Sequence, residues 1–174
     1  MRVSDIQTCL SIGGGTTSKR AEAIATELRG ANLLPKGGRG PYAPDADAVD
    51  AAAFVLAVVG AERIGDAVMT SLTLSALIDA SGCPLSDILT GFLRRPQSCS
   101  DVRRLIVQPI IPMAEINFYD APSHFFSTSA FWETEVSPLA QMQGFAGHAG
   151  LIGGAVLFQI AKKLETQQIQ EIIA

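Results

Sequence analysis

This sequence has few of the residues from which metal centres and disulfide frameworks are built. Its three cysteines, Cys9, Cys83 and Cys99, are widely spaced and form no CxxC pair, so we expect neither a zinc site nor a disulfide scaffold. Its two histidines, His124 and His148, have no second ligand type at metal-binding spacing. We therefore predict no metal site and no catalytic histidine.

Fingerprints of common nucleotide-binding and hydrolytic sites are also missing. The segment from Gly13 to Lys19 contains three glycines before a helix start, but it lacks the GxxxxGK(S/T) spacing of a phosphate-binding loop. No nucleophile elbow and no dinucleotide motif occurs in the chain. We expect a protein that is not an enzyme, has no catalytic residues and needs no cofactor.

The chain also lacks the patterns that direct proteins to membranes. The start, Met1 to Asp5, has no basic region followed by a long apolar stretch, and this favours a cytoplasmic location. The apolar stretch 51–61 is about half the length of a membrane span. The stretch 145–161 is interrupted by glycines, His148 and Gln159, so we expect no membrane partner.

Apolar residues, in contrast, are plentiful. They make up 48% of the 174 residues, against 17% charged residues, and the mean hydropathy is +0.28. The material for a core is ample, and some apolar surface is expected to be covered by another copy of the chain. We predict a homo-oligomer whose contacts include Phe145, Leu151, Leu157 and Phe158.

The charges are divided unevenly along the chain. Residues 1–44 contain six basic and three acidic residues, whereas residues 45–174 contain seven basic and fourteen acidic ones. The head therefore has a net charge of +3 and the rest −7. Because phosphate attraction is local and screened within about 8–10 Å, this division favours DNA contact through the head alone.

Hydrophobic periodicity predicts an α+β protein with an N-terminal winged helix-turn-helix, a helical middle, and a C-terminal β-hairpin plus helix. The residues Ala21, Ile24, Ala25 and Leu28 form a buried stripe on the second helix, for which Thr16, Thr17 or Ser18 is the N-cap and Gly30 the C-cap. Besides this second helix, the expected helices are 4–12, 45–60, 64–80, 85–93 and 144–173, and the expected hairpin strands are 105–118 and 124–136.

These elements suggest three parts. Residues 1–80 form the winged helix-turn-helix head, 81–104 a linker with a short helix and a hinge at 94–98, and 105–174 an oligomerisation body. Pro109 and Pro112 remove hydrogen-bond donors from the first hairpin strand and force an edge or a bulge there.

The head carries the candidate DNA contacts. A helix-turn-helix reads DNA with the amino end of its second helix, and here that end offers hydroxyls, amides and cations. The segment 31–44 follows as a wing, in which two apolar residues lead into a glycine-rich turn whose backbone can approach the duplex. The candidate DNA-binding residues are Thr16, Thr17, Ser18, Lys19 and Arg20 on the helix, and Lys36 and Arg39 in the wing.

The wing segment, LLPKGGRG at 33–40 followed by Ala43-Pro44, resembles that of small helix-turn-helix proteins from phages, prophages and their bacterial hosts. The winged heads of MerR-type regulators are similar at LLP. The resemblance covers about the first third of the chain and implies contact with double-stranded DNA through Lys19, Arg20, Lys36 and Arg39.

Three functions are compatible with these features. The first is a dimeric, sequence-specific transcriptional regulator, and the second is a small terminase-like packaging factor. The third is a phage protein-binding factor that inhibits a host or defence protein. A further basic group, Arg94, Arg95, Arg103 and Arg104, either contacts phosphate as well or pairs with nearby acidic residues.

Overall fold

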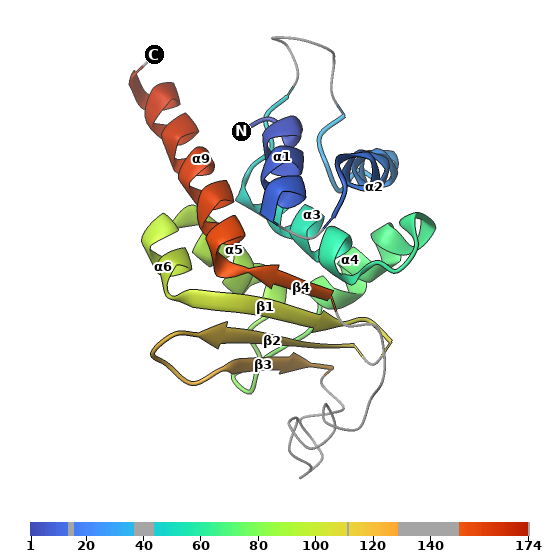
Figure 1. Cartoon of the computed structure of the whole chain (residues 1–174), viewed down its shortest axis with the longest axis vertical. Coiled ribbons are helices and arrows are strands. Elements are labelled where there is room, and N and C mark those ends of the chain that lie inside the picture. The colour runs from blue at the N-terminus through green and yellow to red at the C-terminus, as the bar shows by residue number, and fades with distance from the viewer. Residues whose placement is uncertain (14–15, 37–43, 111, 129–149, 174) are drawn as a thin grey trace.

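The computed structural model describes residues 1–13, 16–36, 44–110, 112–128 and 150–173 of the chain, which fold into helices around one antiparallel sheet (Figure 1). The α+β class is thereby confirmed. The helices are α1 (Val3–Gly13), α2 (Ser18–Gly30), α3 (Ala48–Gly60), the 3-10 helix η2 (Ile64–Asp66), α4 (Ala67–Ser75), α5 (Leu85–Arg94), α6 (Pro96–Ser100) and α9 (Gly154–Ile173). The strands are β1 (Val102–Gln108), β2 (Met113–Phe118), β3 (His124–Ser127) and β4 (Gly150–Gly153).

Side-chain caps fix where α2 and α3 begin. The Thr17 hydroxyl accepts a hydrogen bond from the backbone N–H of Arg20 at the start of α2. Asp47 caps α3, and Asp50 completes a capping box by accepting from the backbone N–H of Asp47. At the other end of α2, the left-handed position is taken by Asn32, with φ of 59°, and not by Gly30, so α2 runs through the glycine.

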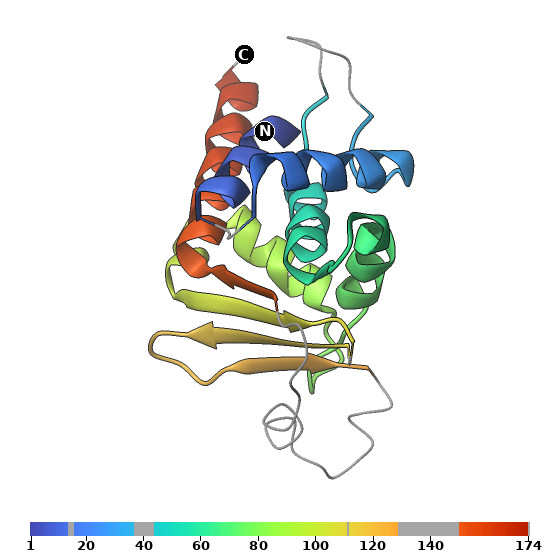
Figure 2. The ribbon, with the colours of Figure 1, turned by 45° about the vertical axis from the view of Figure 1, so that its right-hand side comes forward.

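Helix α3 occupies the centre of the helical layer. Phe54, Val55, Leu56 and Ala57 are fully buried in it, because α1, α2, α4 and α5 all pack around it. Figure 2 shows α2 on the side of this layer away from the sheet, with α3 between them. In both ribbon views α9 runs from the sheet along the side of α1, and α9 also contacts α5 and α6.

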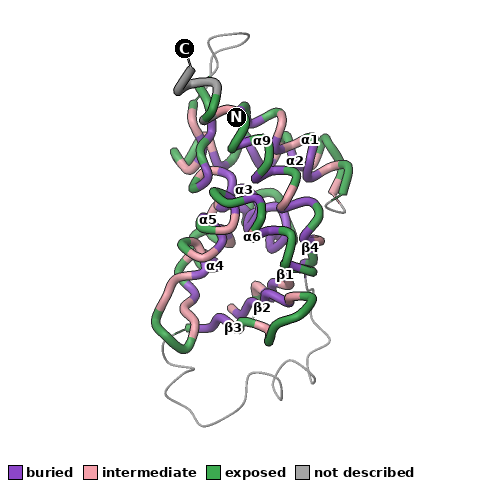
Figure 3. The backbone as a smooth tube through the Cα atoms, turned by 90° about the vertical axis from the view of Figure 1, so that its left-hand side faces the viewer, coloured by how far each residue is buried: buried purple, intermediate pink, exposed green. Residues whose placement is uncertain are grey.

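The sheet has the strand order β3-β2-β1-β4, and every pairing is antiparallel. One face is buried toward the helices. Leu105, Ile116 and Ile152 are aligned across three strands on this face and are fully or almost fully buried. Phe92 of α5 meets Phe118 of β2 edge-on, with ring centroids 5.9 Å apart. In Figure 3, buried residues are seen along the helices and along β1 and β2.

The strand predictions need correction. Residues 105–118 form two paired strands, β1 and β2, joined by a turn around Pro109 and Pro112, and not one strand with a bulge. Two prolines that lack N–H donors are better accommodated in a turn than in a ladder. The second expected strand is observed at 124–127 as β3, and its part at 129–136 lies outside the described residues.

Two helix predictions were also wrong in their extent. The helix expected at 64–80 is η2 followed by α4 and ends at Ser75, after which Ile78 bridges to Ser127 of β3. The helix expected at 144–173 starts only at Gly154, because residues 150–153 pair with β1 as β4. Its part at 144–149 lies outside the described residues.

The hinge expected at 94–98 is replaced by a packed corner. Arg95 directly follows α5 and immediately precedes α6, whose Pro96 and Cys99 are buried. Helix α6 packs against α9. One hydrophobic cluster therefore includes residues from the expected head, linker and body, from Val3 of α1 through Leu93 of α5 to Leu164 of α9.

The residues expected to hold two copies together have other surroundings. Leu157 is only 1% exposed and belongs to the core of one chain, and Phe158 is partly buried against that core. Leu151 is 52% exposed on β4. Phe145 lies outside the described residues. Leu157 was thus a wrong prediction, since α9 uses this side of its surface within the chain.

Candidate nucleic-acid interface

Helix α2 has one buried face and one open face. Its buried face consists of Ala21, Ile24, Ala25 and Leu28, none of which has measurable exposure. These side chains fix the helix against α1 and α3. The predicted stripe is confirmed, and the remaining face of α2 is left toward solvent at the edge of the helical layer (Figure 2).

The amino end of α2 brings together most of the predicted helix contacts. Thr17, Ser18 and Lys19 are all exposed there. The hydroxyl of Thr17 is engaged in the cap, whereas no hydrogen bond or ion pair of the Lys19 side chain is seen within the described residues. The Thr16 hydroxyl differs, because its oxygen is buried and has no hydrogen-bond partner in the described part of the chain.

Arg20 points in another direction. Its Nη2 donates hydrogen bonds to the backbone carbonyls of Ala61 and Glu62, the second at 3.2 Å. Ala61 is the C-cap of α3, where helix carbonyls carry partial negative charge. Arg20 thus ties the start of α2 to the end of α3. The sequence contains no local signal of this contact, because the two segments are 41 residues apart.

The wing is described only at its two ends. Leu34 is buried and anchors residues 31–36, and Lys36 is exposed two residues further on. No strand occurs at 31–36 or 44–47. Arg39 lies outside the described residues. Lys19 lies in the first turn of α2, and a helical rise of about 1.5 Å per residue separates it from Gly30, the last residue of the helix, by roughly 17 Å. Lys36 follows Gly30 by six residues.

Acidic side chains also lie on the open face of α2. Glu22 and Glu27 are exposed there. Carboxylates repel phosphates, although a glutamate can accept a hydrogen bond from the amino group of cytosine. These two carboxylates offset two of the three cations of α2, which are Lys19, Arg20 and Arg29, so the non-specific attraction of the helix for phosphate is weak.

The second basic group is spread over three elements. Arg94 ends α5, Arg95 links α5 to α6, and Arg103 and Arg104 lie in β1; all four are exposed. Arg104 donates from Nε to Asn117 Oδ1 at 2.5 Å. Asn117 in turn donates to Glu115. Arg104 therefore takes part in a polar network on the sheet that ends on a carboxylate.

The fold and this surface define a small α+β protein in which a helix with an exposed polar face lies at the edge of a helical layer. No family model, no curated protein and no solved structure matches the chain. No helix in the described ranges combines the length and apolar character that crossing a membrane requires. Within the same ranges, no three His, Cys, Asp or Glu side chains gather as metal ligands do.

Proposed function

We propose that this protein is a dimeric, sequence-specific DNA-binding transcriptional regulator of the phage type that its wing segment resembles. The observation that supports this function best is the geometry of α2. Its apolar side is completely buried, while Thr17, Ser18 and Lys19 are exposed at its amino end. A recognition helix needs this arrangement to enter a major groove about 12 Å wide.

The two lysines are assigned different contacts. Lys19 lies beside the first backbone N–H groups of α2, and these groups and the ammonium both attract a phosphate. Lys36 is exposed in the wing segment that follows α2, and it is assigned to the phosphate backbone that flanks the groove. In a symmetric dimer, two such heads about 34–36 Å apart would read an inverted repeat.

The salt dependence of binding tests this assignment. The full chain is titrated against a fluorescent duplex from the region upstream of its own gene, at several salt concentrations. Lys19→Ala and Lys36→Ala are each expected to weaken binding and to reduce the slope of log K against log salt by about 1, because each removes one phosphate contact. Glu22→Gln is expected to strengthen binding, since it removes a carboxylate from the same face.

Lys162→Ala is the matched control. Lys162 is also an exposed lysine on a helix, but it lies on α9, away from α2. The salt slope of the Lys162→Ala variant should equal that of the unchanged protein. If all three lysine variants have the same slope as the unchanged protein, α2 and the wing do not contact DNA.

A protein-binding function is the second candidate. Met69 and Leu72 are exposed one turn apart on α4, at 65% and 46%, and exposed apolar side chains of this kind are typical of protein contacts. A full chain without DNA affinity at low salt would favour this alternative.

A further inference from the structure

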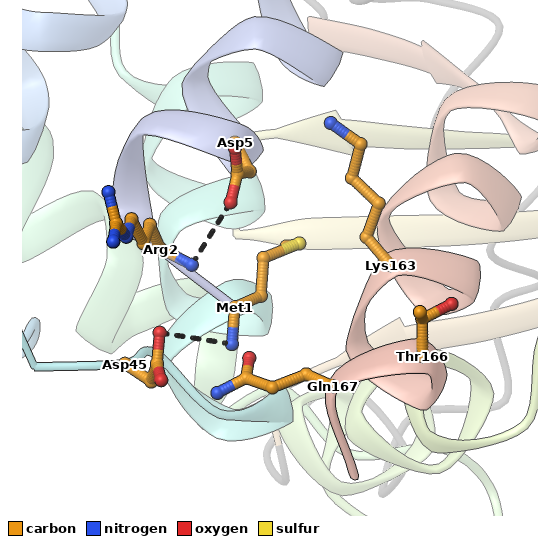
Figure 4. A pocket seen from close by; sticks show the side chains of 7 residues that line it. All are labelled: Met1, Arg2, Asp5, Asp45, Lys163, Thr166 and Gln167. Carbon is orange, nitrogen blue, oxygen red and sulfur yellow. Dashed lines mark hydrogen bonds and ion pairs between the residues drawn. The ribbon is translucent and has the colours of Figure 1, made fainter. Parts of the chain in front are cut away.

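Two cavities lie along the seam between α1 and α9, and Lys163 lines both of them. The first has a volume of about 360 Å³, and its walls include Ile12 of α1 and Ala155 and Val156 of α9. The second, of about 390 Å³, continues past Lys163 toward the start of α1 and is lined mainly by polar residues (Figure 4). Each falls in the size range of pockets that hold small organic ligands, roughly 300–1,000 Å³.

The walls of the first cavity are mainly apolar and include one charged side chain. Lys163 is the single charged residue among the described residues that line it. The Thr8 hydroxyl in its wall already donates to the carbonyl of Ser4, at 2.8 Å. Burial raises the pKa of the Cys9 thiol, although the nearby Lys163 ammonium partly offsets this effect. Cys9 is therefore neutral near pH 7 and supplies no anion to balance Lys163.

Lys163 is placed between the two cavities. Its side chain interacts with Cys9 in the wall of the first cavity. Figure 4 shows it extending away from Thr166 and Gln167, which lie on the same helix. The second cavity contains the carboxylates of Asp5 and Asp45, of which Asp5 accepts a hydrogen bond from the Arg2 backbone N–H at 3.2 Å. No ion pair joins Lys163 to either carboxylate within the described residues.

We propose that this seam binds a small monocarboxylate with an apolar chain, of the fatty-acid type. The chain lies in the first cavity against Val156, and the carboxylate accepts hydrogen bonds from the Lys163 ammonium at its border. Binding covers Ile12, which is 83% exposed in the protein alone, and removal of apolar surface from water stabilises the complex by about 25 cal/mol per Å². Lys163 would repel an amphiphile with a cationic head group, and an amphiphile with a neutral head group would give the ammonium no anionic partner. An anionic head group therefore fits this site best.

Calorimetric titration of the full chain with sodium octanoate tests the site, with octylammonium and 1-octanol as probes of equal chain length. Octanoate is expected to bind more tightly than either. Lys163→Met is expected to weaken octanoate binding about tenfold or more, because charge-assisted hydrogen bonds are the strong ones. Lys162→Met, which removes a neighbouring lysine that lines neither cavity, should leave it unchanged.

A second variant tests the apolar half separately. Ala155 is exposed on the first turns of α9 and lines the first cavity, so Ala155→Trp is expected to fill the cavity and abolish octanoate binding without disturbing the core. Thermal unfolding followed by circular dichroism verifies that both variants fold. No octanoate binding at millimolar concentration, equal affinity for octylammonium, or unchanged affinity in both variants would each overturn the proposal. None of these measurements involves DNA, so the outcome is independent of the proposed regulatory function.

Discussion

Arg20, one of the candidate DNA contacts, donates hydrogen bonds within the protein. Its guanidinium is bound to two backbone carbonyls at the end of α3. Releasing it to a phosphate would leave those carbonyls without this donor, and lost hydrogen bonds of charged groups typically cost about 1.5–3 kcal/mol. Lys19, one residue earlier and exposed, has no such constraint. Of the two neighbours, Lys19 is the better assigned to DNA and Arg20 to holding α2 in position.

The three cysteines are expected to differ sharply in reactivity. Burial raises the pKa of Cys99 to about 12, and its thiol donates to the carbonyl of Phe92 at 3.0 Å. At pH 8 only about one molecule in ten thousand then carries the thiolate, which is the reactive form. Cys9 is buried and has a raised pKa as well, chiefly by desolvation. Cys83 is partly exposed.

Alkylation with iodoacetamide at pH 8, read by peptide mass spectrometry, is expected to modify Cys83 first and Cys99 last in the folded protein. In denaturant, where burial is lost, all three should react at similar rates. Modification of Cys99 as fast as Cys83 without denaturant would contradict the buried position of Cys99 in α6.

At the scale of elements, helices with strong local signals were predicted best. The cap of α2 was one of three candidates, Thr16, Thr17 or Ser18, and the buried stripe followed directly from its spacing. The β4 strand was missed because its cause is not local. An added Cβ at Gly150 would collide with the carbonyl of Val59, and one at Gly154 with the carbonyl of Val102. The sequence pattern included Gly150 and Gly154 in one long helix. In the structure, their lack of a side chain allows β4 and the start of α9 to lie against the backbone of Val59 and Val102.

A matched pair of glycine substitutions tests this account. Gly154→Ala is expected to destabilise the protein by about 1–3 kcal/mol or more, since the new methyl group meets rigid backbone. Gly91 lies inside α5, is exposed, and has no atom within 4 Å of an added Cβ. Gly91→Ala should therefore stabilise the protein by about 0.5–1 kcal/mol through helix propensity. Urea unfolding measures both, and effects of the same sign would refute the proposed role of Gly154.

At the scale of the whole molecule, the sequence suggested a boundary near residue 80, where the helix expected at 64–80 ends, and the charge division between residues 44 and 45 supported a separate head. The distribution of charge indicates which residues face solvent, but it does not indicate which apolar faces pack against each other. In the structure, apolar faces on the two sides of residue 80 pack together. Helix α3 packs against α5, β1 and β4, and α1 packs against α9. The candidate DNA face could be assigned to α2 from the residues of that helix alone. The helices that α2 packs against, α1 and α3, are in turn held by α9 and β4, which lie more than 90 residues further along the chain than α2.

A fragment ending at Ser81 is therefore expected not to fold on its own. It would keep α1 to α4 but lose α5, the sheet and α9, which cover residues such as Val59 and Leu10 that are buried in the full chain. Exposing these faces removes about 25 cal/mol of stabilisation per Å² of apolar surface, against a total stability of only about 5–15 kcal/mol for a domain. Circular dichroism of the fragment should show reduced helicity and no cooperative melting, whereas the full chain should unfold in a single transition. A cooperative transition in the fragment would show that α1 to α4 hold a sufficient core, and the head could then be tested for DNA binding by itself.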